Sequence, residues 1–155
     1  MTARVTSKNY ITDGPGRAML NLQKEVESSG LDRTLLELVK VRASQLNGCA
    51  YCIDMHTKDA RARGETEQRL YALNAWRETP FFSDRERAAL EWTEEVTQVA
   101  DTHVRDDVYE RVRALFSEPE LVALTFAVVA INGWNRLAIA FRAPAGSYQP
   151  QPVAV

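Results

Sequence analysis

Apolar residues recur every three to four positions along most of this chain, which is the spacing of an amphipathic helix. No segment shows the sustained alternation of apolar and polar residues that is typical of a strand. The pattern therefore predicts an all-α fold of about six to eight helices in a single domain. The predicted helices cover approximately residues 17–28, 33–46, 49–63, 65–76, 84–99 and 106–116, with a last helix from about residue 118.

Polar residues at several helix starts support these boundaries. Ser83 and Glu86 are three residues apart, as are Ser117 and Glu120, and each pair has the spacing of a capping box. In that motif the two residues accept hydrogen bonds from N–H groups that a helix start leaves unpaired. Asp32 is placed to cap the helix that follows it. The sequence thus predicts three defined helix starts.

The two ends of the chain look less regular than its centre. Residues 1–15 are interpreted as an extended N-terminal arm, closed by Gly14-Pro15-Gly16, a run that we expect no regular element to tolerate. Residues 143–155 are rich in proline and small residues and are predicted to form an irregular tail, which could lie over a neighbouring subunit. Residues 16–142 would form the helical domain.

Two predicted helices have apolar residues on nearly every face, around Leu35–Leu46 and Leu121–Ile131. A chain of 155 residues offers few amphipathic helices to cover both of them. Because leftover apolar surface tends to be buried between identical copies, we expect a symmetric homo-oligomer. The run Leu121–Ile131 is too short to cross a bilayer, which needs about twenty residues, and is predicted to be the central buried helix.

Charge narrows the choice of partners and location. The chain has 19 basic and 21 acidic residues and a net charge of −2, which predicts no nucleic-acid and no membrane partner. The first residues lack the apolar segment of a secretory signal, so a cytoplasmic location is expected. In that compartment a close pair of cysteines is more often catalytic or metal-binding than structural.

Candidate chemistry is concentrated between Glu37 and His56. The only two cysteines, Cys49 and Cys52, stand beside one of the only two histidines. Asn47-Gly48 predicts a helix end, and in a new helix from about Cys49 the two thiols and His56 share one face. The unpaired N–H groups and the dipole of the first turn favour thiolate over thiol. The pattern indicates an activated dithiol that can form a disulfide, with His56 to exchange protons and Glu37 to orient or recharge it.

Other interpretations of the same residues stay open. The cysteines could be plain core residues, since free cysteine is often buried. Zinc could bind Cys49, Cys52 and His56 with Glu37 as a fourth ligand, although the chain has no second CxxC. Covalent haem is excluded because Ile53, rather than histidine, follows the second cysteine.

The spacing from Glu37 to His56, with both cysteines between them, resembles the signature of the alkylhydroperoxidase D-like (carboxymuconolactone decarboxylase-like) superfamily. The segment Ile131–Arg136 resembles the Asn-x-Trp-Asn-Arg motif of the same family, and the similarity extends from about residue 21 to residue 141. The resemblance implies an all-helical homo-oligomer, a trimer or hexamer, that reduces hydroperoxides with thiols. The prediction includes no cofactor and no metal.

The resemblance also implies a role for each site residue. Cys52 would attack the peroxide, Cys49 would resolve the sulfenic acid, Glu37 and His56 would relay protons, and an external dithiol would reopen the disulfide. Tyr51 stands where the best-known pattern has a second histidine, and tyrosine carries protons poorly at neutral pH because its pKa is about 10. We predict a hydroperoxide reductase. The alternative is a redox-responsive or ligand-binding oligomer of this family with little turnover.

Further polar residues are assigned structural roles. His103 is expected at the surface or at a helix end, because nothing chemical accompanies it in the sequence. Arg136 is expected to pair with an acidic residue near the site or across an interface, since an unpaired buried charge costs several kcal/mol. A solvated outer face is expected of Asp54, Lys58, Asp59 and Arg61.

Overall fold

The structure is a computed structural model that describes residues 2–12 and 14–150. Its helices are α1 (Lys8–Ile11), α2 (Pro15–Glu27), α3 (Arg33–Asn47), α4 (Ala50–Ala62), α5 (Glu67–Ala72), η1 (Leu73–Glu78), α6 (Asp84–Thr97), α7 (Val99–Thr102), α8 (Asp106–Arg113) and α9 (Glu118–Phe141). The described residues form no strand, which confirms the all-α prediction. The helices outnumber the six to eight predicted because α1 and α7 are single turns of four residues.

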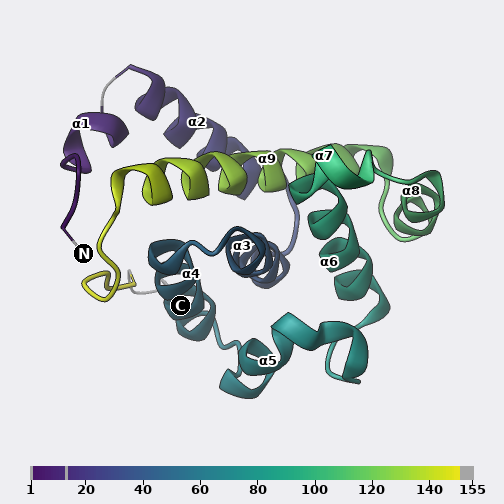
Figure 1. Cartoon of the computed structure of the whole chain (residues 1–155). Helices are drawn as coiled ribbons and strands as arrows, with labels where there is room; N and C mark the ends of the chain where they lie inside the picture. Colours follow the sequence, from purple (N-terminus) through teal and green to yellow (C-terminus); the bar gives the residue numbers. More distant parts are fainter. Residues whose placement is uncertain (1, 13, 151–155) are drawn as a thin grey trace.

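Helix α3 occupies the centre of the molecule. It packs against α4, α6 and α9, and α9 also contacts α2, α6 and α8. In Figure 1 the long α9 lies across α3, with α8 at one end of the molecule and α1 at the other. The largest group of buried apolar side chains joins α3, α6, α8 and α9, and includes Leu36, Val39, Val112 and Leu124. Helix α4 therefore packs against α3, which is itself fixed by the core.

The helix starts predicted from the sequence are confirmed. The carboxylate of Asp32 accepts a hydrogen bond from the N–H of Leu35 at 2.8 Å, which caps α3. Capping boxes begin α6 at Ser83 and α9 at Ser117. These local signals needed no tertiary information, because both partners of each bond lie within one turn.

The N-terminal arm is more regular than predicted. Helix α1 forms one turn within it, and α2 begins at Pro15, inside a run that sequence reasoning excludes from helices. That exclusion is wrong because proline fits the first turn of a helix, where its missing N–H would be unpaired anyway. A Cβ atom at Gly16 would lie 2.1 Å from the carbonyl oxygen of Tyr10, so glycine allows α1 to pack on α2. Residues 1 and 13 lie outside the described residues.

The two strongly apolar helices differ in how completely they are covered. Ten consecutive residues of α3, Leu35–Ser44, are buried. Helix α9 buries one face but leaves Val122, Phe126 and Val129 about half exposed. The expectation that the two helices cannot both be covered is therefore confirmed, with α9 as the uncovered one. The prediction that Leu121–Ile131 is the central buried helix is wrong, because α3 takes the central position and α9 packs on it with one face only. Within the described ranges α9 is also the one helix long and apolar enough to cross a membrane, a property that core helices share.

Residues 143–150 form neither helix nor strand, as predicted, and they lie along α4 of the same chain. The ammonium of Lys58 donates a hydrogen bond to the carbonyl oxygen of Tyr148 at 3.0 Å. The hydroxyl of Tyr148 donates to Asp59 at 2.8 Å. The outer face of α4 is thus partly covered by the tail, so the prediction of a solvated face holds for Arg61 and only in part for Asp54, Lys58 and Asp59. Residues 151–155 of the predicted tail lie outside the described part of the chain.

Candidate functional site

The turn between α3 and α4 places both cysteines. Gly48 ends α3 in the left-handed conformation, with a φ of 68°, which glycine adopts without strain. The N–H of Cys49 then donates to the carbonyl oxygen of Ser44 at 2.9 Å, and Cys49 becomes the N-cap of α4. Cys52 follows in the first turn of this helix. The two thiols therefore meet at a helix start, as the spacing predicts.

Both cysteines are buried and free, and a hydrogen bond couples their ionisation. The N–H of Cys52 donates a hydrogen bond to Sγ of Cys49 at 3.4 Å. The Cys52 thiol also donates to this sulfur and lowers the pKa of Cys49 to about 7, against the opposing effect of burial. The same interaction, together with burial, raises the pKa of Cys52 well above its ordinary range. Above pH 7 the pair carries one negative charge, centred on Cys49, and retains one proton.

Asn135 of α9 connects the thiol pair to α3. Its fully buried side chain forms hydrogen bonds that favour the thiolate at both sulfurs. The amide nitrogen of Asn135 donates to Oγ of Ser44 at 3.0 Å, and the amide oxygen accepts from Asn47 at 2.8 Å. These contacts fix the amide group, so α9 contributes an oriented polar group to the thiol site.

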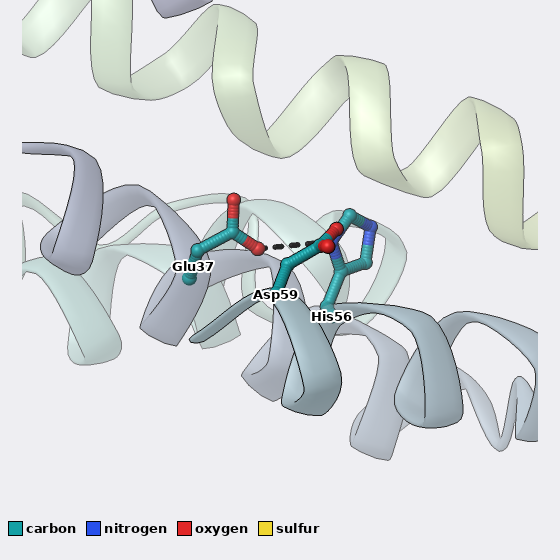
Figure 2. Close-up of side chains that lie close together, drawn as sticks. All are labelled: Glu37, His56 and Asp59. Atoms are coloured by element: carbon teal, nitrogen blue, oxygen red, sulfur yellow. Dashed lines mark hydrogen bonds and ion pairs between the residues drawn. The ribbon is translucent and has the colours of Figure 1, made fainter. Parts of the chain in front are cut away.

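Glu37 of α3 and His56 of α4 form a buried pair. Oε2 of Glu37 lies 3.0 Å from Nδ1 of His56, and Figure 2 shows the carboxylate directed at this edge of the imidazole. A carboxylate only accepts hydrogen bonds, so Nδ1 carries the proton. In the neutral imidazole the lone pair is then on Nε2, which lies on the side of the ring away from Glu37. Glu37 therefore sets the tautomer of His56.

Lys40 keeps Glu37 ionised. Its ammonium donates to Oε1 of Glu37 at 2.9 Å and lies 3.7 Å from Oε1 of Glu27. Burial by itself would raise the pKa of Glu37, but the hydrogen bond from His56 and the charge of Lys40 lower it to about 2. Glu37 is therefore a carboxylate throughout the neutral pH range. Glu37 was expected either to orient His56 or to supply it with a proton. The low pKa of Glu37 favours the orienting role, because a carboxylate has no proton to give.

A pocket of about 350 Å³ opens beside this pair. Four of its lining residues, Cys52, His56, Asp59 and Arg63, follow one another at the spacing of a single face of α4. The apolar part of the lining comes from Tyr10, Ile11, Leu20, Met55, Trp134 and Ala138. Cys49 does not line this pocket. A substrate that enters it meets Cys52 and His56, with Cys49 behind them.

Besides Tyr10, two tyrosines line the same pocket, Tyr51 and Tyr148. Burial raises the pKa of both Tyr51 and Tyr148, and the hydrogen bond to Asp59 raises the pKa of Tyr148 further. Tyr51 therefore stays protonated at neutral pH. It is therefore no proton acceptor there, unlike a neutral histidine.

Glu37, His56 and Asp59 offer ligand atoms that all lie within 4.8 Å of one another, and Figure 2 shows the three side chains converging. The cysteines are not part of this group, so the described residues do not assemble the Cys/Cys/His/Glu zinc site considered above. One oxygen of Glu37 is already bonded to the Lys40 ammonium, whose charge would repel a metal ion. The cluster is better explained as a hydrogen-bonded network.

The structure brings together the four site residues singled out in the sequence: Glu37, Cys49, Cys52 and His56. No hydrogen bond within residues 2–12 and 14–150 joins His56 to either sulfur. Both Cys52 and His56 line the pocket, so a substrate or a water molecule bound there would have to bridge them for a proton to pass.

Sequence reasoning missed four residues at the site: Lys40, Asp59, Asn135 and Tyr148. Lys40 had a signal, because it stands one turn after Glu37 in a stretch that is otherwise apolar. Asn135 was noted in a motif without a chemical role. Tyr148 gave no signal, since its partner Asp59 lies far away in the sequence.

The two remaining polar residues have structural positions. His103 is exposed and follows the last residue of α7, as predicted. Arg136 is exposed and donates to the carbonyl oxygen of Asn132 at 2.9 Å. No acidic partner of Arg136 occurs among the described residues, so the expected ion pair is absent from the chain itself. Its guanidinium is exposed to water, so it needs no ion pair to offset a cost of burial.

Comparisons with known proteins extend the similarity from motifs to the whole fold. The sequence matches the Carboxymuconolactone decarboxylase family over residues 16–95. It is 46% identical over 140 residues to the uncharacterized protein YdfG of Bacillus subtilis, which covers 90% of this chain and 95% of that protein.

Solved structures show the same architecture. ATU0492 from Agrobacterium tumefaciens, a protein of unknown function suggested to be an antioxidant defence protein AhpD, is 40% identical with a TM-score of 0.90, over 95% of this chain and all of that chain. The debrominase Bmp8 is 17% identical with a TM-score of 0.76, over 85% of this chain and 71% of its own, which shows likeness of fold alone. With the alkylhydroperoxidase D-like fold in place and the family match covering more than half of its length, this chain belongs to the carboxymuconolactone decarboxylase family.

Proposed function

We propose that this protein is a thiol-dependent hydroperoxide reductase. The observation that carries the proposal is the position of Cys52 in the wall of a pocket, with the free thiol of Cys49 behind it and His56 one turn further along α4. A nucleophile, a resolving thiol and an oriented imidazole are the three groups that such a reaction needs.

The chemistry balances as a two-electron reduction of the peroxide. The Cys52 thiolate attacks an oxygen of the hydroperoxide, an S–O bond forms, the O–O bond breaks, and the leaving alkoxide takes a proton to become an alcohol. Cys49 then attacks the sulfenic sulfur, the disulfide forms, and the displaced hydroxide takes a proton to become water. An external dithiol reduces the disulfide by exchange and is oxidised in its place.

Two proton movements are assigned to residues of the site. The Cys52 proton passes to Cys49, which moves the negative charge to the sulfur that lines the pocket. His56 accepts a proton at Nε2 from water in the pocket and delivers it to the leaving alkoxide, which supplies the one proton that the thiol pair itself lacks. The carboxylate of Glu37 stabilises the imidazolium that forms in between, because it already accepts the hydrogen bond from Nδ1.

The proposal includes a homo-oligomer, a trimer or hexamer, that works in the cytoplasm with a dithiol reductant as partner. Support for the oligomer comes from the apolar residues Val122, Phe126 and Val129, which recur at helical spacing on the uncovered face of α9. Burial of this stripe between copies would remove from water a surface that the chain itself leaves exposed.

Stopped-flow measurement of peroxide consumption tests the reaction. Cys52→Ser should abolish it, and Cys49→Ser should stop after one turnover because no disulfide can form. The chain offers a matched control in its two histidines: His56→Asn should slow consumption, while His103→Asn at the exposed helix end should not. If both cysteine variants consume peroxide like the parent, the mechanism is wrong.

Thiolate absorbance tests the assignment of charge. In the parent one thiolate should form with a pKa of about 7. In Cys52→Ala, which removes the donating side chain, the pKa of Cys49 should rise towards the ordinary cysteine value of about 8.5. An unchanged pKa would mean that Cys52 does not lower it.

A second candidate function is that of a redox-responsive or ligand-binding oligomer with little turnover. Tyr51, with its raised pKa in place of a relay histidine, favours it. A free-thiol count before and after peroxide, read together with turnover, separates the two. Loss of two thiols with sustained turnover supports the reductase, whereas thiol loss without turnover supports the alternative. Metal analysis of the purified protein tests zinc in the same sample.

A further inference from the structure

Arg63, at the end of α4, faces the pocket without a partner. It lines the pocket and a small recess beside it. Its Nε atom is buried and has no hydrogen-bond partner, and no ion pair between described residues includes Arg63. By contrast Arg42 and Arg69, whose side chains are also largely buried, pair with Glu94 and Glu65. The terminal amino groups of Arg63 form no hydrogen bond among the described residues either, and they are not among the buried atoms, so a ligand in the pocket can bind them.

The charges around Arg63 favour an anion as this ligand. The recess beside it is lined by the cationic side chains of Arg33, Lys40 and Arg63 and by the carboxylates of Glu27 and Glu37. Both carboxylates are already within 3.7 Å of the Lys40 ammonium. The recess lining thus carries one net positive charge at the Arg63 end, which the Asp59 carboxylate of the pocket lining balances further towards Cys52, and the guanidinium of Arg63 is available at the pocket wall.

Arg63 and Cys52 stand at the two ends of the lining stripe of α4. They are eleven residues apart, which corresponds to about 16 Å along the helix axis. Long side chains near a helix lean towards its N-terminus, which would bring the guanidinium nearer to Cys52 than this backbone distance. Asp59, between them, has its carboxylate engaged by the Tyr148 hydroxyl at 2.8 Å. Figure 2 shows Asp59 and His56 side by side on this face, with Glu37 opposite.

We propose that Arg63 binds the carboxylate of an anionic organic hydroperoxide whose peroxide group reaches Cys52. The inference rests on the proposed function and names its substrate class. A guanidinium can hold a carboxylate through two parallel hydrogen bonds, which fixes one end of the substrate. The apolar chain then lies against Met55, Trp134 and the other apolar residues of the lining. Hydroperoxides of fatty acids have this combination of groups, whereas hydrogen peroxide has neither anchor nor chain.

Turnover with two matched substrates tests the anchor. The probes are linoleic acid hydroperoxide and its methyl ester, which differ in charge at one end. For the parent, kcat/KM should be higher for the acid. In Arg63→Ala, kcat/KM for the acid should fall about tenfold or more, as expected for loss of a charge-assisted pair, while the ester changes less than about twofold. Arg63→Lys should recover part of the loss for the acid because it keeps the charge but loses the fork.

Arg61 provides the matched control on the same helix. Its side chain is exposed and does not line the pocket. Arg61→Ala should therefore leave kcat/KM for both substrates within about twofold of the parent, a range that covers ordinary surface effects. An equal loss for acid and ester in Arg63→Ala would show a structural effect and overturn the anchor.

Binding without turnover separates this inference from the proposed function. Titration calorimetry on Cys52→Ser protein compares decanoate with decanamide, neither of which contains a peroxide. Decanoate should bind more tightly, and Arg63→Ala should remove the difference. If the parent turns over no hydroperoxide but this difference is present, the reductase proposal fails and the anion site stands. If the two compounds bind equally, or Arg63→Ala changes nothing, the anion site is wrong whatever the enzyme does.

Discussion

Helices α3 and α9 are both strongly apolar, yet they differ in what they bury. α3 buries the charged side chains of Glu37, Lys40 and Arg42, and each of these has an opposite charge within hydrogen-bond distance. α9 has no charged residue between Glu120 and Arg136, and it leaves apolar side chains exposed instead. The comparison shows where function is placed: the paired charges of α3 build the site, and the uncovered face of α9 is suited to contact another copy.

The largest expected effect comes from removing one charge of α3. Glu37→Gln leaves the buried Lys40 ammonium without its close partner and should lower the free energy of unfolding by about 3–5 kcal/mol. Urea unfolding of the purified variant measures it. Glu25→Gln, on the exposed side of α2, is the control and should change it by less than about 0.5 kcal/mol. Equal effects at both positions would show that the buried ion pair adds no more to the free energy of unfolding than an exposed residue does.

Acid should reveal the same pair without a mutation. The pKa of Glu37 is about 2 in the folded protein and about 4.3 in an unfolded chain, a difference worth about 3 kcal/mol. Because the folded pKa is the lower one, this stability is present above about pH 5 and is lost as the pH falls towards 2. Urea unfolding across that range should show the loss, and the profile of Glu37→Gln should be flatter. Parallel profiles would contradict the assigned pKa.

The exposed face of α9 should control assembly more than folding. Phe126→Asp places a charge in the apolar stripe and should weaken association by about 2–3 kcal/mol, with little effect on the helical content of the subunit. Light scattering at micromolar concentration measures the shift to smaller species. Tyr71→Asp, on exposed α5, is the control and should leave the oligomer intact. A parent protein that is already monomeric would refute the oligomer.

The smallest effect should distinguish the two sides of α9. Val128 is fully buried and Val129 is 48% exposed, although they are neighbours. Val128→Ala should cost about 1.5–2 kcal/mol from the two lost methyl groups and the cavity they leave. Val129→Ala should cost less than about 0.5 kcal/mol in the subunit, so any larger loss that depends on protein concentration would locate it in an interface. Calorimetric unfolding at two concentrations makes the measurement.

Features of the fold that depend on near neighbours could be predicted from the sequence. The caps at Asp32, Ser83 and Ser117 and the helix start at Cys49 each rest on residues within one turn, and the structure has all four. The helix over residues 17–28 was predicted, but α1 before it was missed, because its packing depends on Gly16 and Tyr10, which meet only when α1 folds back on α2. Local signals therefore predicted the helix boundaries, except where a boundary depends on a tertiary contact.

The site divides in the same way. The spacing of Cys49, Cys52 and His56 on one helix put them on one face, and an unusual apolar setting drew attention to Glu37. The other polar groups came from contacts that no spacing reveals: Asn135 reaches the thiols from α9, and the tail brings Tyr148 to α4. The order of the thiol pKa values also depends on which sulfur accepts the N–H at the helix start, and the sequence did not show that.

Because one face of α4 lines the pocket, the position of Arg63 relative to Cys52 depends on the number of residues between them. Inserting one residue between His56 and Arg63 would rotate the guanidinium by about 100° and turn it away from the thiol. Inserting a whole turn of three or four residues would keep it on the same face and move it about 5 Å further along the axis. The length of α4 would then set the distance between the bound carboxylate and the thiol. Relatives with a longer or shorter α4 would accept hydroperoxides of different chain length.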